Sequence, residues 1–252
     1  MTDALLTVSN LSKTFDGLKA VEDFSCTIAK SKIVGLIGPN GAGKTTVFNI
    51  ITGFLAADAG EIHYAGKNIT RLPPYRIAHN GIVRTFQDLR LIASLPVIEN
   101  ILLARQKQTG ENWLATFALR KKVLKEEHEN RQIALDILNQ VGLANKHEHL
   151  AGALSYGQQK LLTLACCLAA EADLLLLDEP VSGVHPSMIE KMLALMAQLA
   201  ASGKTILFIE HNLDVVMQVS DHVIVMDAGR KIMEGRPEAV KNDPEILEAY
   251  LE

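Results

Sequence analysis

Cysteine is scarce in this chain of 252 residues. Its three cysteines are Cys26 and the adjacent pair Cys166 and Cys167, an odd number with no C-x-x-C spacing. This pattern predicts neither a zinc site nor a disulfide framework. We therefore expect reduced thiols in a cytosolic protein, where the three side chains serve as small apolar residues.

An excess of positive charge is also missing. The 25 Lys and Arg residues stand against 29 Asp and Glu residues, which gives a net charge of -4. The basic cluster Arg120-Lys121-Lys122 is small, and acidic residues follow it. A nucleic-acid-binding protein normally presents a basic face, so no nucleic-acid partner is expected.

Long apolar runs are absent as well. The longest, LLTLACCLAA from Leu161 and LLLL from Leu174, fit a protein core and are too short to span a bilayer. The first ten residues, MTDALLTVSN, lack the positive start and apolar segment of a signal peptide. We expect neither a membrane span nor a secretory leader.

What the chain does contain is ample material for a folded core, since 48% of its residues are hydrophobic. Apolar strands alternate with helices in the first and last thirds of the sequence. Such alternation predicts a mostly parallel sheet. Residues 97–150 are mostly helical in pattern, which indicates an insertion into the sheet domain. The predicted fold class is therefore α/β.

The inserted segment has helical periodicity. Ile133, Ile137 and Val141 recur at helical spacing opposite a charged face, and Gly142 is expected to end that helix. Upstream, one residue pair lies one turn apart and is expected to pack in the core: Trp113 and Phe117.

A glycine-rich loop carries the strongest functional signal. GPNGAGKTT, from Gly38 to Thr46, fits G-x-x-x-x-G-K-[ST] and lies between a predicted strand and a predicted helix. Its glycines allow backbone N–H groups to point at phosphates, Lys44 can reach the β- and γ-phosphates, and the Thr45 hydroxyl can ligate Mg²⁺. The loop therefore predicts a nucleotide triphosphate site.

Two carboxylates support this prediction. Asp178 ends the apolar strand in LLLLDEP, where a Walker B aspartate holds the Mg²⁺ shell, and Glu179 follows at once. Glu179 could polarise an attacking water. His211 ends another apolar strand, TILFIEH, and Gln87 lies in RTFQDLR. Neither of these last two residues is informative by itself.

A second stretch, LSYGQQ, also suits phosphate. Ser155 can cap a helix, and Gln158 can close a capping box with it. The helix N-terminus then offers free N–H groups and the positive end of the helix dipole. The chain thus carries two separate phosphate-binding features.

Taken in order, these motifs resemble those of the ATP-binding subunit of an ABC transporter. GPNGAGKTT is similar to Walker A, TFQ to the Q-loop, LSYGQQ to the ABC signature, LLLLDEP to Walker B and IEH to the H-loop. The resemblance implies a P-loop NTPase (RecA-like) core with an N-terminal antiparallel β subdomain and an inserted α-helical subdomain. We expect one ABC domain over 1–252, with a catalytic core in 1–96 and 161–252 and a signature subdomain in 97–160.

The resemblance also assigns roles to individual residues, with ATP and Mg²⁺ as cofactors. It implies that catalysis depends on Glu179, His211 and Gln87. It implies ATP contacts by an adenine-stacking aromatic and by the glycine-rich loop: Phe15, Gly38, Pro39, Asn40, Gly41, Ala42, Gly43, Lys44, Thr45 and Thr46. It implies metal contacts by Thr45, Gln87 and Asp178. The signature residues would act in trans, on ATP held by a second subunit: Ser155, Tyr156, Gly157 and Gln158.

Two positions depart from the family pattern. Tyr156 replaces the more usual glycine of the signature, and we expect its side chain to point away from the nucleotide. His185, in SGVHP, stands where the family usually has Asp or Asn in contact with the partner's Walker A loop. Coupling across that interface could be altered, or the partner could be a different, compensating chain.

Longer stretches are similar to the branched-chain amino-acid importer group, among them VRTFQDLRLIASLPVIEN and the ending GRKIMEGRPEAVKNDPEILEAYLE. The likeness implies a second ATPase subunit, identical or different, together with integral membrane permeases and a solute-binding protein. It places the chain peripherally on the cytoplasmic face of the inner or plasma membrane. Urea, amide and other amino-acid importers share much of this pattern.

Two functions of other classes remain open. A soluble ABC protein of translation or DNA maintenance usually has two ATPase domains or a long coiled coil, whereas this sequence has one P-loop and no sustained heptads. A stand-alone P-loop kinase or GTPase would leave LSYGQQ without a role.

Overall fold

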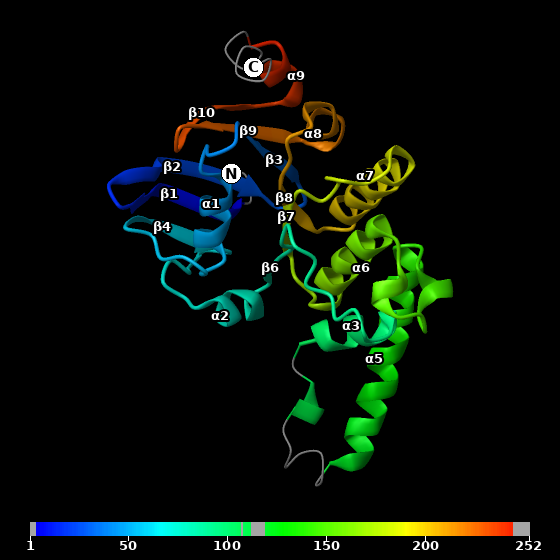
Figure 1. The fold of residues 1–252 in the computed structure, drawn as a ribbon. Coiled ribbons are helices and arrows are strands. Elements are labelled where there is room, and N and C mark those ends of the chain that lie inside the picture. Colours follow the sequence, from blue (N-terminus) through cyan, green and yellow to red (C-terminus); the bar gives the residue numbers. More distant parts are fainter. Residues whose placement is uncertain (1–3, 107, 112–118, 244–252) are drawn as a thin grey trace. The chain divides into compact units, whose positions relative to one another are not determined.

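The computed structural model describes residues 4–106, 108–111 and 119–243 (Figure 1). The chain forms two compact units. The first is drawn from residues up to 87, from 173–182 and from 189 onward, and the second from 88–172 and 183–188. The helical segment expected at 97–160 lies within the second unit, where the helix that starts at Tyr156 continues to Ala169. The assignment of a separate role to each subdomain stays a prediction.

The first unit contains an antiparallel sheet near the N-terminus. Its strand order is β2-β1-β4-β5. The turn between the first two strands has positive φ at both Asp16 and Gly17, as the tightest hairpins require. The four strands are β1 (Ala4–Phe15), β2 (Leu18–Ala29), β4 (Ala59–Tyr64) and β5 (Lys67–Asn68). This is the antiparallel β subdomain that the resemblance implied.

The second sheet of this unit is mostly parallel. Its order is β10-β9-β3-β8-β7-β6, and among the strands that the structure describes in this sheet only β10 runs antiparallel to its neighbour. The strands are β3 (Ile33–Ile37), β6 (Ile82–Arg84), β7 (Leu174–Asp178), β8 (Thr205–Ile209), β9 (His222–Asp227) and β10 (Arg230–Gly235). Every residue of β3, β7 and β8 is buried, as expected for central parallel strands. The carboxyl ends of these neighbours meet at one edge, where ligands of such sheets bind.

The described helices of the first unit link successive strands, except the helix at 237–241, which follows β10. They are α1 (Lys44–Ile51), α2 (Pro74–His79), α8 (Leu213–Val219), α9 (Pro237–Lys241) and most of α7 (Pro186–Ala201). The hydrophobic core includes Phe24, Phe48 and Ile62, each at most 1% exposed. The α/β class and the P-loop architecture expected from the sequence are confirmed.

The second unit is helical. Its elements are α3 (Val97–Ala104), α5 (Arg120–Gln140), α6 (Tyr156–Ala169) and the 3-10 turns Thr109–Glu111, Ala144–Lys146 and Ala151–Ala153. In α5 the buried line passes through Ala134 and Leu138, so the predicted Ile133 and Ile137 lie half-buried beside it. The third predicted residue, Val141, follows the helix and is buried. Gly142 follows the helix with φ 74, the conformation that favours glycine at a helix end. The predicted pair Trp113 and Phe117 lies outside the described residues.

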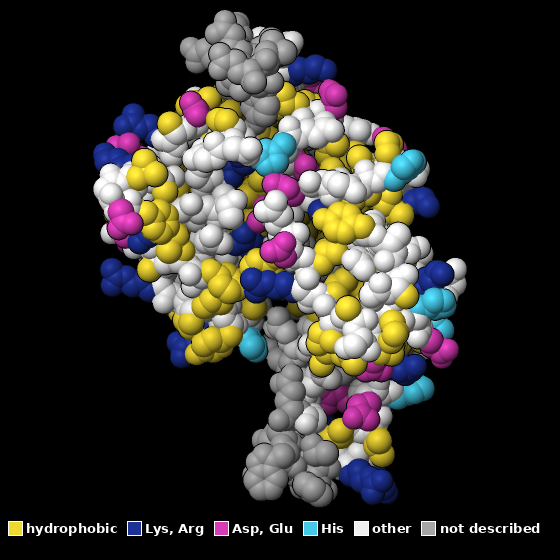
Figure 2. All heavy atoms as spheres, in the orientation of Figure 1, with side chains coloured by type: hydrophobic (Ala, Val, Ile, Leu, Met, Phe, Trp, Pro, Cys, Tyr) yellow, Lys and Arg dark blue, Asp and Glu magenta, His cyan; other side chains and the backbone are white. Residues whose placement is uncertain are grey.

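Three further expectations concern thiols, membranes and surface charge. The cysteines are free, and burial raises the pKa of each to about 12, so they are unreactive at neutral pH. None of the described helices combines the length and apolar character needed to cross a membrane. Acidic and basic side chains are interspersed on the face seen in Figure 2.

Candidate functional site

The carboxyl edge of the parallel sheet carries a cavity of about 340 Å³. Four segments far apart in the sequence supply its polar lining: Asn40, Gly41, Ala42, Gly43, Lys44, Thr45, Thr46, Gln87, Glu179 and His211. Ala20 and Ile209 complete it. The structure thus brings most of the sequence-predicted cis residues together. Phe15 is 44% exposed and is not part of the lining.

The glycine-rich loop has a backbone that only glycine adopts without strain. Gly38, Gly41 and Gly43 have φ of 150, 83 and 97. A Cβ on Gly38 would lie 2.0 Å from the Met226 carbonyl oxygen, and one on Gly43 would lie 2.4 Å from that of Ala20. No side chain caps α1, which begins directly after Gly43. Its first N–H groups are therefore available to an anion.

We expect Gly43→Ala to destabilise the fold more than Gly41→Ala. Both positions have positive φ, which costs an L-residue about 1–2 kcal/mol. Only the new methyl at 43 meets backbone, because a Cβ on Gly41 has nothing within 4 Å. The clash should add about 1–3 kcal/mol. Urea denaturation of the two variants measures this difference, and equal stabilities would contradict the close packing of the loop.

Lys44 folds over this loop. Its Nζ donates hydrogen bonds to the carbonyl oxygens of Gly38 at 2.7 Å and Pro39 at 2.8 Å. Desolvation lowers the pKa of Lys44, while the charges of Glu179 and Asp178 act in the opposite direction. A desolvated ammonium next to unpaired helix N–H groups gains strongly from a phosphate. The loop therefore fits the phosphates of a nucleotide.

Glu179 and His211 form a pair in the cavity. His211 Nε2 lies 2.9 Å from Glu179 Oε1, and the backbone N–H of Glu179 donates to the Ile209 carbonyl at 3.0 Å. Glu179 has φ 48, an uncommon conformation for a residue with a side chain. The turn after it is held by Glu210, which is 2% exposed and accepts the Val181 N–H at 2.8 Å. The carboxylate of Glu179 is thus aimed and held at the cavity.

Asp178, expected at the end of an apolar strand as a ligand of the Mg²⁺ shell, ends β7 and is held by two neighbours. Its side chain is only 6% exposed, and its Oδ2 accepts a hydrogen bond from Arg84 Nη2 at 2.7 Å. Its backbone N–H donates to Thr85 Oγ1 at 2.9 Å. Sequence reasoning missed Arg84 and Glu210. Each is a charged residue at the end of an apolar strand, the same signal that singled out Asp178.

The donor set around the cavity suits Mg²⁺. The described residues contain no group of three or more His, Cys, Asp or Glu side chains that could hold a metal without other ligands. Mg²⁺ commonly binds through one or two carboxylates together with substrate phosphates. A hydroxyl from Thr45, an amide from Gln87 and the carboxylate of Asp178 are hard oxygen donors of that kind. The residues present fit a metal that arrives with a nucleotide.

The signature stretch forms the predicted capping box in the second unit. Ser155 Oγ accepts the Gln158 N–H at 3.4 Å, and Gln158 Oε1 accepts the Ser155 N–H at 3.1 Å. The ring of Tyr156 packs beside Gly183, where an added Cβ would lie 3.2 Å from Tyr156 Cε1. Lys160 Nζ lies 5.4 Å from the centre of the same ring. Tyr156 is therefore held by its own unit.

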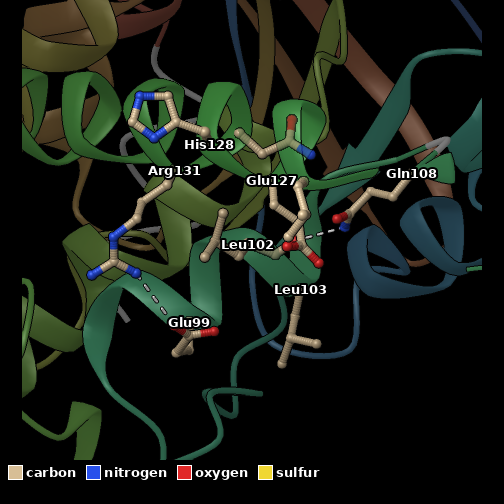
Figure 3. Close-up of a pocket in the computed structure, with 9 residues that line it drawn as sticks. Glu99, Leu102, Leu103, Gln108, Glu127, His128 and Arg131 are labelled. Carbon is tan, nitrogen blue, oxygen red and sulfur yellow. Dashed lines mark hydrogen bonds and ion pairs between the residues drawn. The ribbon is translucent and has the colours of Figure 1, made fainter. Parts of the chain in front are cut away.

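A second hollow, of about 550 Å³, lies between α3 and α5 (Figure 3). Arg131 Nη1 is 3.7 Å from Glu99 Oε1 across it. Leu103 and Leu124 in its wall are 61% and 54% exposed. The other lining residues are Leu102, Gln108, Glu127, His128 and Asn130. This α3–α5 groove combines exposed leucines with charges of both signs.

Comparisons with known proteins show which family this chain belongs to. The model of the ABC transporter family matches residues 21–182. The high-affinity branched-chain amino acid transport ATP-binding protein BraF of Pseudomonas aeruginosa is 38% identical over 100% of this chain and 99% of its own length. A probable branched-chain amino acid transport ATP-binding protein, LivG of Archaeoglobus fulgidus, is 40% identical over 98% and 95%.

Solved structures are similar over the same extent. A nucleotide-free ATP-binding cassette from an ABC transporter superposes with a TM-score of 0.85 at 37% identity, covering 98% of both chains. The ADP conformation of an ATP-binding cassette of an ABC transporter gives 0.85 at 36% identity, again over 98% of both.

Proposed function

The chain belongs to the ABC transporter family, and from this premise we propose that it is the ATP-hydrolysing subunit of an importer of branched-chain amino acids. The observation that carries the proposal is the cavity in which the glycine-rich loop meets Gln87, Glu179 and His211. The two relatives named as branched-chain amino acid transport ATP-binding proteins align with 98% or more of this chain and support branched-chain amino acids as the solute.

Within the cavity, each side chain has a chemical task. Lys44 and the N–H groups of the loop bind the phosphates and offset their charge. Glu179 orients a water molecule and takes its proton, while His211, 2.9 Å away, fixes the carboxylate and would contact the γ-phosphate. Mg²⁺ would be held by Thr45, Gln87 and Asp178 and would neutralise developing charge on the phosphoryl oxygens.

The signature stretch completes the site of a second subunit. The Ser155 end of α6 and its neighbours Tyr156, Gly157 and Gln158 would close on the γ-phosphate that the partner's glycine-rich loop holds. The capping box supports this role because it fixes the first turn of the helix. The working unit is then a pair of ATPase subunits, of like or different chains.

The α3–α5 groove would receive a short amphipathic helix of a membrane permease. Its exposed leucines and mixed charges suit the apolar and polar faces of such a helix. The chain would then sit peripherally on the cytoplasmic face of the membrane. A solute-binding protein on the far side would deliver the amino acid.

Deletion of the gene in its own host tests the proposal. Uptake of labelled leucine, isoleucine and valine should fall to background, and the wild-type gene should restore it whereas a Glu179→Gln copy should not. Uptake of labelled urea and acetamide serves as the matched control. Loss of urea or amide uptake with leucine uptake intact would replace the proposed solute class.

A further inference from the structure

Arg84 is a buried cation for which neither the sequence motifs nor the proposed chemistry gives a task. It ends β6, and its side chain is 4% exposed. The guanidinium forks between two acceptors: Nη2 donates to Asp178 Oδ2 at 2.7 Å, and Nη1 donates to Asn49 Oδ1 on α1. Arg84 thus connects the carboxylate of β7 with the helix that follows the glycine-rich loop.

Stability alone is a poor explanation for this pair. Burial of two charges costs desolvation energy, and a buried ion pair is often no more stabilising than well-packed apolar residues. Within the described residues, Arg84 Nε is also buried without a hydrogen-bond partner, which adds to the cost. What the planar fork provides is geometry, because it fixes one oxygen of Asp178 and leaves the other for a metal shell.

The residues that follow Arg84 extend this arrangement toward Gln87. Thr85 Oγ1 accepts the backbone N–H of Asp178 at 2.9 Å. The Phe86 ring centre lies 5.0 Å from the guanidinium carbon, and the Phe48 ring centre lies 5.5 Å from the same carbon. Phe86 in turn meets Phe54 edge to face, with ring centres 5.5 Å apart. The segment leading to Gln87 is therefore packed directly on the group that holds Asp178.

We propose that Arg84 is a positioning residue of the metal site: it orients the Asp178 carboxylate and ties that orientation to the segment that carries Gln87. The inference rests on the proposed function, in which Asp178 and Gln87 both serve Mg²⁺. It deepens that function by making the metal carboxylate sensitive to the position of the Phe86–Gln87 segment.

Metal affinity, measured separately from turnover, tests this role. Mn²⁺ is the probe, and its affinity for the ADP-bound protein is read from the electron paramagnetic resonance signal of free Mn²⁺. Arg84→Lys keeps the charge and removes the fork. It should weaken Mn²⁺ binding about tenfold, the effect typical of residues that orient metal ligands. Affinity for ADP in EDTA should stay within about twofold of the wild type, since the phosphate loop is unchanged.

Two further variants ensure that the conclusion does not depend on Arg84→Lys alone. Asn49→Ala removes the second arm of the fork while leaving the ion pair, and should weaken Mn²⁺ binding by less than the loss of about tenfold expected for Arg84→Lys. Arg76→Lys is the matched control: Arg76 also lies over an aromatic ring, that of Tyr75 at 5.9 Å, and should leave Mn²⁺ affinity unchanged.

The possible outcomes distinguish failure of the Arg84 positioning role from failure of the assignment of Asp178 as a metal ligand. Unchanged Mn²⁺ affinity in Arg84→Lys and Asn49→Ala, with Asp178→Asn still weakening it, would overturn the positioning role alone. Unchanged affinity in Asp178→Asn would overturn the metal assignment and this inference together. An equal loss of Mn²⁺ affinity and of ADP affinity in EDTA would mean that Arg84 only maintains the fold.

Discussion

Replacement of Glu179 by glutamine is expected to lower ATP turnover by about 10² to 10⁴-fold while ATP binding persists. The amide cannot take a proton from water, which is the contribution a general base makes. The amide nearly preserves the volume of the carboxylate, so the cavity with Gln87, His211 and the glycine-rich loop should keep its shape. Phosphate release measures turnover, and equilibrium dialysis with labelled ATP measures binding.

The same variant should accumulate as an ATP-bound pair of subunits. With hydrolysis blocked, the nucleotide that joins the two subunits is not consumed, so size-exclusion chromatography with ATP should show a dimer. Glu129→Gln is a matched control, because Glu129 lies on α5, is 58% exposed and pairs with Lys125 at 3.6 Å. Wild-type turnover in Glu179→Gln would remove this residue from its proposed role.

Two variants that are each inactive alone are expected to restore ATP turnover when they are mixed and form a dimer with one chain of each kind. Lys44→Ala removes the cation that the glycine-rich loop positions, and Ser155→Arg blocks the first turn of α6. Each variant alone should lose about 10² to 10³-fold in turnover, the effect of removing one charge-stabilising group. In a mixed pair, one site combines the intact loop of one chain with the intact signature of the other. Turnover of the mixture should therefore exceed the sum of the two separate preparations.

The control for this experiment is one chain that carries both substitutions, mixed with either single variant, since no complete site can then form. Wild-type turnover by Ser155→Arg alone would contradict the action of α6 on a neighbour's nucleotide. Rescue of each dead variant only by a different ATPase subunit would identify the working pair as heteromeric.

Features set by neighbouring residues were predictable from sequence, and features set by strand pairing were not. The glycine-rich loop and the capping box at Ser155 each depend on a few consecutive residues, and both take the predicted form. The fork of Arg84 depends on β6 lying beside β7, with Arg84 level with Leu176. No local pattern indicates that pairing, so the contact between Arg84 and Asp178 could not be predicted from the sequence.

Charged residues at or just after the ends of apolar strands are a shared signal that the sequence does contain. Arg84 ends β6, Asp178 ends β7 and Glu210 follows β8. Arg84 pairs with Asp178, and Glu210 accepts a hydrogen bond from the turn after Glu179. The one-residue offset of the buried line of α5 has a different cause: both flanks of an amphipathic helix carry apolar residues, and tertiary packing selects between them.

At Glu179 the backbone conformation that best suits stability and the side chain that catalysis needs are in conflict. A residue with a side chain pays for φ 48, and glycine would adopt that angle without strain. Selection for heat resistance in the laboratory would therefore favour the loss of the base, and a library sorted by thermal tolerance alone would enrich inactive chains. The enzyme keeps a strained backbone conformation at Glu179 because its chemistry requires a carboxylate there.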